Sequence, residues 1–150
     1  MRLTRGTAAG PALAGLVWAL AGSSAADTLQ VPGEYATIQE AIDAATTGDI
    51  VELADGTHLG EGNREIDFRG KAVTLRSASG DPGQCIINCE QAGVALRIYQ
   101  GEGADTVVEG LTIINAFGDS ASKGAALYCA QSTPTIRNCI FMGNQSLGEG

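Results

Sequence analysis

The chain has 150 residues, which is the size of one domain. Its 17 Asp and Glu residues outnumber its nine Lys and Arg residues, and its formal net charge is −8 at pH 7. The acids are scattered, and such a surface repels the phosphate backbone of nucleic acids, which excludes nucleic acid as a partner. The same charge argues against a simple electrostatic attraction of polyanionic sugars.

The first residues have the three-part layout of a secretory signal peptide. Met1–Arg5 carries two positive charges, Pro11–Ala21 is an uncharged run, and small residues in GSSAA follow. The apolar run is shorter than the ~20 residues that a membrane-spanning helix needs. We predict that residues 1–26 are removed and that residues 27–150 are secreted or reach the cell surface without a transmembrane span. An uncleaved anchor or a disordered tail is the alternative.

One short amphipathic helix is predicted near the start of the mature chain. Thr37 and Glu40 have the spacing of a capping box. In this motif the Thr side chain accepts the backbone N–H of the Glu, and the Glu side chain accepts the backbone N–H of the Thr. Apolar residues then recur on one helix face, at Ile38, Ala41, Ile42 and Ala45. We expect a cap helix over about 37–46, and Gly48 as its stop.

From about residue 48 the helical periodicity disappears, and short apolar runs rich in β-branched residues alternate with clusters of Gly, Asp, Asn and Ser. The runs predict strands at 50–53, 73–76, 85–89, 94–99, 106–114, 125–129 and 135–142. No helix is expected between them, which argues against a doubly wound α/β fold. A β-sandwich and a β-solenoid remain.

Internal repeats favour the solenoid. VEGLTIIN (108–115) aligns with IRNCIFMG (136–143) at an offset of 28, and ALRI (95–98) aligns with ALYC (126–129) at an offset of 31. CIINC (85–89) offers a partial third copy, in which Ile86 and Cys89 match Ile136 and Cys139. Such units stack their strands in parallel, with like residues above like.

Several segments carry a family resemblance: ATIQEAIDAATTGDIVELADGTH, GNREIDFRGKAVTLRSASG, CIINCE and VEGLTIINAFGDSASKGAALYCAQSTPTIRNCIFMGN. They resemble the right-handed parallel β-helix proteins of the pectate-lyase-like superfamily, and more narrowly its exported bacterial repeat proteins. The resemblance covers about 27–150 and implies an all-β, right-handed parallel β-helix with a short N-terminal capping helix. It also implies further coils, so we expect the chain to be an N-terminal fragment.

The resemblance directs attention to acidic residues, because enzymes of the superfamily use carboxylates that converge on one outer face. Asp49, Asp55 and Asp67, together with Glu65, are candidates for a Ca²⁺ or substrate face, although turn residues and solvated surface positions are the favoured explanation. The segment 67–70 is similar to an esterase Asp-Phe segment, but the partner motifs are absent. His58, the single histidine, is expected in an exposed loop. We name no catalytic residue and no required cofactor.

Asparagines and cysteines have a structural interpretation in this fold. An inner asparagine ladder is expected from Asn88, Asn115, Asn138 and Asn144. The repeat alignment places Cys89 and Cys139 at equivalent inward positions with Leu111 between them. Two strand spacings of ~4.8 Å are too long for a disulfide. Cys129 is expected over Ile98, and the cysteines are expected to pack mainly as small apolar side chains. Cys85 and Cys89 form the only local pair.

Three functions are compatible with this sequence. The first is a non-catalytic exported or surface solenoid that binds an extended polymer such as polysaccharide or is displayed on it. The second is a polysaccharide lyase or hydrolase whose site lies on coils beyond residue 150. The third is a structural or adhesive passenger domain. Trp18 leaves with the signal peptide, so a sugar-stacking surface has to use the three Tyr and three Phe residues.

Overall fold

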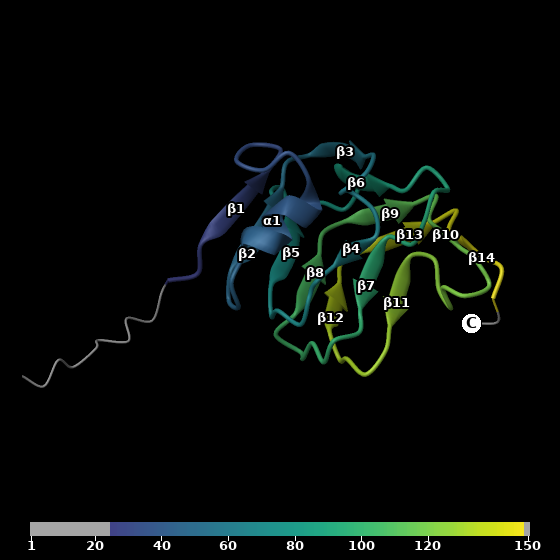
Figure 1. The fold of residues 1–150 in the computed structure, drawn as a ribbon. Coiled ribbons are helices and arrows are strands. Elements are labelled where there is room, and N and C mark those ends of the chain that lie inside the picture. Colours follow the sequence, from purple (N-terminus) through teal and green to yellow (C-terminus); the bar gives the residue numbers. More distant parts are fainter. Residues whose placement is uncertain (1–24, 149–150) are drawn as a thin grey trace, which may run out of the picture.

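The chain forms a coil of short parallel strands (Figure 1). The structure is a computed structural model that describes residues 25–148. The predicted signal peptide, residues 1–26, lies outside this range apart from its last two residues. Within the described range, no helix has the length and apolar character that a membrane crossing requires.

The described residues form one helix and 14 strands of two to four residues each. In chain order these are β1 (Thr28–Val31), α1 (Ile38–Ala44), β2 (Ile50–Leu53), β3 (Gly56–Leu59), β4 (Ile66–Asp67), β5 (Thr74–Ser77), β6 (Cys85–Asn88), β7 (Leu96–Ile98), β8 (Val107–Glu109), β9 (Thr112–Ile114), β10 (Phe117–Gly118), β11 (Leu127–Cys129), β12 (Thr135–Arg137), β13 (Ile140–Met142) and β14 (Gln145–Ser146).

The strands pair in parallel and build three sheets along the coil. The first sheet has the order β1-β2-β5-β8-β12, the second β3-β6-β9-β13 and the third β4-β7-β11, with β10-β14 as a separate short pair. Each coil contributes one strand to each sheet, so β2, β3 and β4 are followed by β5, β6 and β7. This arrangement confirms the predicted β-solenoid, whereas its right-handed sense stays a prediction.

Both repeat offsets found in the sequence are confirmed by the strand register. Val108 pairs with Ile136, and Ile113 pairs with Phe141, which is the offset of 28. Leu96 pairs with Leu127, which is the offset of 31. The difference between the offsets is absorbed in the turns, so sequence repeats of unequal length still stack strand on strand.

The third copy was aligned wrongly. Ile86 pairs with Thr112 in the second sheet and is not in a column with Ile136, which belongs to the first sheet. The preceding run, β5, already supplies the first-sheet strand of that coil, so CIINC has to form the second-sheet strand. Cys85 and not Cys89 therefore shares the register column of Leu111 and Cys139, because Ile86, Thr112 and Ile140 pair directly after them.

Two of the predicted strands are each divided by a corner. The run 106–114 splits into β8 and β9 at Gly110, whose φ is 68°, and the run 135–142 splits into β12 and β13 at Asn138, whose φ is 49°. A single residue in the left-handed region turns the chain from one sheet to the next, and glycine and asparagine tolerate that conformation best.

The interior is a stack of apolar columns closed at one end by the helix. Val51, Leu75 and Val108 form a fully buried column on the first sheet. Each buried side chain of this size contributes about 1.5–3 kcal/mol relative to exposure. Helix α1 buries Ile38 and Ile42 and contacts β1, β2 and β4, so it covers the first coil, as Figure 1 shows.

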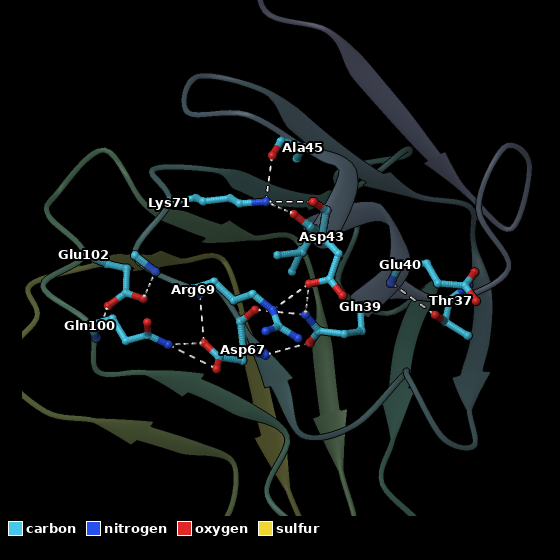
Figure 2. Close-up of polar contacts among 12 residues, drawn as sticks. Thr37, Gln39, Glu40, Asp43, Ala45, Asp67, Arg69, Lys71, Gln100 and Glu102 are labelled. Atoms are coloured by element: carbon cyan, nitrogen blue, oxygen red, sulfur yellow. Dashed lines mark hydrogen bonds and ion pairs between the residues drawn. The ribbon is translucent and has the colours of Figure 1, made fainter.

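The helix begins at its predicted cap but ends earlier than predicted. The Thr37 hydroxyl accepts the Glu40 N–H, and the Glu40 carboxylate accepts the Thr37 N–H, which forms both halves of the capping box. The helix stops at Ala44, because the Asp49 carboxylate holds the Thr46 N–H at 2.7 Å outside the helix. The Lys71 ammonium then donates to three carbonyls at the helix end (Figure 2), which are those of Ile42, Asp43 and Ala45.

The expected asparagine ladder is present only as one pair. The Asn115 amide donates to the Asn88 side-chain oxygen at 3.2 Å. Asn144, on the next coil, bonds the backbone instead, where it accepts the Ala116 N–H at 2.8 Å. Asn138 lies at a different corner and donates to the Gly80 carbonyl at 2.8 Å, so its assignment to the ladder was wrong.

Glu102 is a buried carboxylate that joins three successive coils at the corner between the third and first sheets. Its side chain is 2% exposed and accepts bonds from the Gly70 N–H (2.9 Å), the Gln100 N–H (2.7 Å) and the Ser132 hydroxyl (2.8 Å). Burial works to raise the pKa of Glu102, but these bonds and its own backbone N–H outweigh it and lower the pKa below its ordinary value. The corner is therefore stabilised by the charged carboxylate.

We expect Glu102→Gln to lower the free energy of unfolding at neutral pH by about 1–3 kcal/mol, because one buried donor loses its ionised acceptor. Since the folded pKa is lowered, the contribution of Glu102 is complete above the unfolded pKa and is lost as pH falls below it. Urea denaturation of Glu102→Gln and of Glu61→Gln, an exposed control, from about pH 7 to pH 3 measures this. Equal stability of the two variants at neutral pH would contradict the assignment.

The four cysteines are free and differ in exposure, which yields a second prediction. Burial raises the pKa of Cys85 to about 12 and that of Cys89 to about 11, whereas Cys129 is exposed. Because the thiolate is the nucleophile, iodoacetamide should modify Cys129 first and leave Cys85 and Cys89 unmodified until the chain unfolds. Peptide mass spectrometry over time reports each site. Fast native labelling of Cys85 would place it outside the core.

Candidate functional site

Asp49, the first of the predicted Ca²⁺ candidates, is a structural carboxylate. It is buried and accepts bonds from the Thr46 N–H, the Thr46 hydroxyl and the Asp27 N–H at 2.7, 2.9 and 3.0 Å. The Thr46 N–H makes the largest contribution to lowering the pKa of Asp49. The two bonds from Thr46 close the turn between α1 and β2, and the bond from Asp27 ties this turn to the residue before β1.

The remaining acidic candidates do not converge with Asp49. Asp55 follows β2 and accepts the Ser79 hydroxyl at 2.7 Å, whereas Asp67 lies in β4 on the third sheet. Glu65 precedes β4 and is bonded to Arg97. Among residues 25–148, no three Asp, Glu, His or Cys side chains gather as a metal-binding group.

The expectation that His58 lies in an exposed loop was wrong. His58 is 7% exposed and sits inside β3, where it pairs with Ile87 of β6. Its Nε2 lies 2.8 Å from the Ala54 carbonyl oxygen. The run GTHL lacks the apolar alternation that marks a strand, and only stacking on β6 turns the imidazole inward.

Asp67 is the centre of a polar network on the third sheet (Figure 2). Its carboxylate accepts bonds from the Arg69 N–H at 2.8 Å, the Gln100 amide at 3.0 Å and the Tyr99 hydroxyl at 3.3 Å. Gln39 of α1 binds both backbone groups of Asp67, at 2.8 and 3.1 Å. The capping helix therefore holds the backbone of Asp67, and donors from two coils hold its carboxylate.

Two tyrosines form an aromatic pair beside this network. The ring centroids of Tyr99 and Tyr128 lie 5.9 Å apart with an interplanar angle of 50°. Tyr99 is 39% exposed, and Tyr128 is half-buried. In the register of the third sheet, Asp67 pairs with Arg97 and Arg97 pairs with Tyr128. These three side chains stand next to one another on the outer face, because their strand neighbours Ile66, Leu96 and Ile98 fill the core.

Arg97 connects the tyrosine pair with a neighbouring cleft. Its guanidinium binds the Glu65 carboxylate, and this bond is the main cause that raises the pKa of Arg97. The negative charge of Asp119 raises the same pKa further. The cleft has a volume of about 400 Å³. It is lined by Glu65, Gln91, Ala92, Gly93, Arg97, Phe117, Asp119 and Ser122. The outer face of the third sheet thus combines aromatic rings, amide and hydroxyl groups, and a hollow on one continuous strip.

The outer face of the first sheet is less suited to a ligand. The first sheet carries a register column of alternating charges, Glu52, Arg76, Glu109 and Arg137, which neutralise one another in pairs. A cleft of about 340 Å³ opens beside this column, near Ser79 and Asn138. No aromatic ring lines it, so it lacks an apolar surface on which a ring-shaped ligand could stack.

The tyrosine pair was not found from the sequence, although a signal for part of it existed. The confirmed offset of 31 places Tyr128 over Arg97. Tyr99 directly follows the buried Ile98 and lies two residues after Arg97, so its side chain is expected on the same outer face as that of Arg97. The contact with Asp67 could not be read from the offsets, because β4 is too short and too polar to be recognised as a strand.

Comparison of this chain with protein-family models, with curated proteins and with solved structures gives no match. Its functional assignment therefore depends on the geometry of the third sheet and its cleft.

Proposed function

We propose that this chain is an exported, non-catalytic solenoid that binds an extended polysaccharide along the outer face of its third sheet. The observation that carries the proposal is the Tyr99–Tyr128 ring pair beside the anchored Asp67 carboxylate. Export to the cell surface or the medium is supported by the charge, apolar and small-residue pattern of residues 1–26.

The chemistry of this face suits sugar rings. Aromatic rings present apolar surfaces to the C–H groups of a sugar, while the Tyr hydroxyls add polar contacts at their tips. Asp67 and Gln100 supply acceptors and donors for sugar hydroxyls, and their mutual bond at 3.0 Å orients both groups in advance. Preorganisation of this kind lowers the entropy cost of binding a flexible chain.

The solenoid geometry suits a polymer rather than a small molecule. Neighbouring strands of the third sheet lie ~4.8 Å apart, so a chain that crosses the strands meets a new coil at each step. The tyrosines come from two adjacent coils, and Asp67 comes from the coil before them. A repeated sheet of this kind offers the extended surface that solenoid proteins use for binding.

The second candidate function is a lyase or hydrolase whose site was expected on coils beyond residue 150, and the acidic and histidine side chains within residues 25–148 do not add to it. His58 is buried against a backbone carbonyl, and Asp49 is fixed by turn hydrogen bonds. Asp67 accepts three different donors, which hold its oxygens in place as a binding group. Asp67 is therefore assigned a binding role, and Asp49 and His58 are assigned structural roles.

Replacement of both tyrosines should abolish most of the binding. We expect Tyr99→Ala/Tyr128→Ala to lose at least about tenfold in affinity, which corresponds to about 1.4 kcal/mol, because two stacking surfaces disappear. The measurement is depletion of the protein by a panel of insoluble polysaccharides, followed by titration with soluble oligomers of the polymer that binds.

Two matched variants separate stacking from folding in this experiment. Tyr99→Phe/Tyr128→Phe keeps both rings and should keep most of the affinity. Phe141→Ala removes an aromatic side chain that is 44% exposed on the second sheet, and it should have no effect. The proposal fails if no polysaccharide in the panel binds, or if Phe141→Ala weakens binding as much as the double Ala variant does.

A further inference from the structure

Almost every cation within the described residues is already engaged by its own chain. Lys71 is held by the helix carbonyls, and Lys123 is the only cation within residues 25–148 that has neither an ion pair nor a hydrogen bond. The arginines in ion pairs with Asp or Glu are Arg64, Arg69, Arg76, Arg97 and Arg137. Within residues 25–148 these pairs use five acids, whereas the chain has 17 acids against nine Lys and Arg residues, so its surplus charge is negative.

The ligand face shares this imbalance. Arg97 is its central cation, and both its Nε and its Nη2 are directed to the same Glu65 oxygen. Asp67 and Asp119 remain as unneutralised carboxylates on the two sides of Arg97, and Lys123 is the nearest free cation in the chain after Asp119. A carboxylate of a ligand would therefore meet two charges of its own sign and no free guanidinium.

Asp119 is the carboxylate of this face with room for a ligand. Its Oδ1 accepts bonds from the Ala121 N–H, the Ser122 N–H and the Ser122 hydroxyl at 3.0, 2.8 and 2.6 Å. Its Oδ2 has no hydrogen bond within the described residues and belongs to a side chain that lines the cleft. An ammonium donor is the natural partner of such an oxygen, because charge-assisted bonds are about twice as strong as neutral ones.

We infer that the polymer bound by this face carries protonated amino groups, as a glucosamine polymer does, and that polyuronates are rejected. This inference rests on the proposed function, because it assigns the ligand class of the same face. A sugar ring stacks on the Tyr99–Tyr128 pair, while an ammonium group of the polymer binds the Asp119 carboxylate in the adjoining cleft. Rejection of polyuronates follows from like-charge repulsion by Asp67 and Asp119, because the guanidinium of Arg97 is already held by Glu65.

Four soluble oligomers of equal length test the charge of the ligand: glucosamine, N-acetylglucosamine, glucose and galacturonate oligomers. Isothermal titration at about pH 5 keeps the carboxylates ionised and the amino groups of the glucosamine oligomer protonated. We expect the glucosamine oligomer to bind at least about threefold more tightly than its N-acetylated form, and its affinity to fall as NaCl is raised. The galacturonate oligomer should show no binding.

Each other outcome has a distinct meaning. Equal, salt-independent binding of the glucosamine, N-acetylglucosamine and glucose oligomers overturns the amine inference and leaves polysaccharide binding intact. Binding of the galacturonate oligomer at equal or higher affinity also overturns the amine inference alone. If none of the four oligomers binds, the amine inference is overturned, and the broader panel of insoluble polysaccharides decides on the proposed function.

Variants of matched geometry locate the interaction. Asp119→Asn keeps the Oδ1 acceptor of the turn and should weaken glucosamine-oligomer binding about threefold. Asp81→Asn is its control, because Asp81 is also an exposed aspartate that accepts a bond within its own turn, from the Gly83 N–H at 2.8 Å, but between the first and second sheets. Equal loss in both variants would show a general charge effect and would remove Asp119 from the site.

Discussion

In-register parallel stacking of coils is the constraint on which the rest of this structure depends. Each strand completes its backbone hydrogen bonds only on the strand of the next coil, so the offset between coils decides which side chains share a column. Val51, Leu75 and Val108 fill the core for this reason, and the turns absorb every difference in coil length. Corners need single residues with positive φ, as at Gly110 and Asn138.

The same constraint separates a rigid face from variable loops. The third sheet places Asp67, Arg97 and Tyr128 side by side on its outer surface, and the positions of these side chains follow from the register. The connections between the second and third sheets differ in length from coil to coil, and they supply Phe117 and Asp119 to the cleft. A binding surface can therefore change its loops without disturbing the core beneath it.

The sequence predicted the features that depend on repetition or on local hydrogen bonding. The offsets of 28 and 31 and the capping box of Thr37 and Glu40 are examples. It failed where one short run had to be assigned to a sheet, as with Cys85–Asn88, because an Ile and a Cys at the same spacing occur on two different sheets. His58 and Tyr99 were missed, because their surroundings come from other coils.

The arrangement of the core and of the third-sheet face therefore depends on the register more than on any single contact. A methyl–methyl nuclear Overhauser experiment on the isotope-labelled protein measures it directly. We expect cross-peaks between Ile87 and Ile113 on the second sheet and between Leu96 and Leu127 on the third, since these residues pair on adjacent strands. Cross-peaks that join Ile86 to Val108 in place of these would assign Cys85–Asn88 to the first sheet and would contradict the register that places the tyrosine pair on the third sheet.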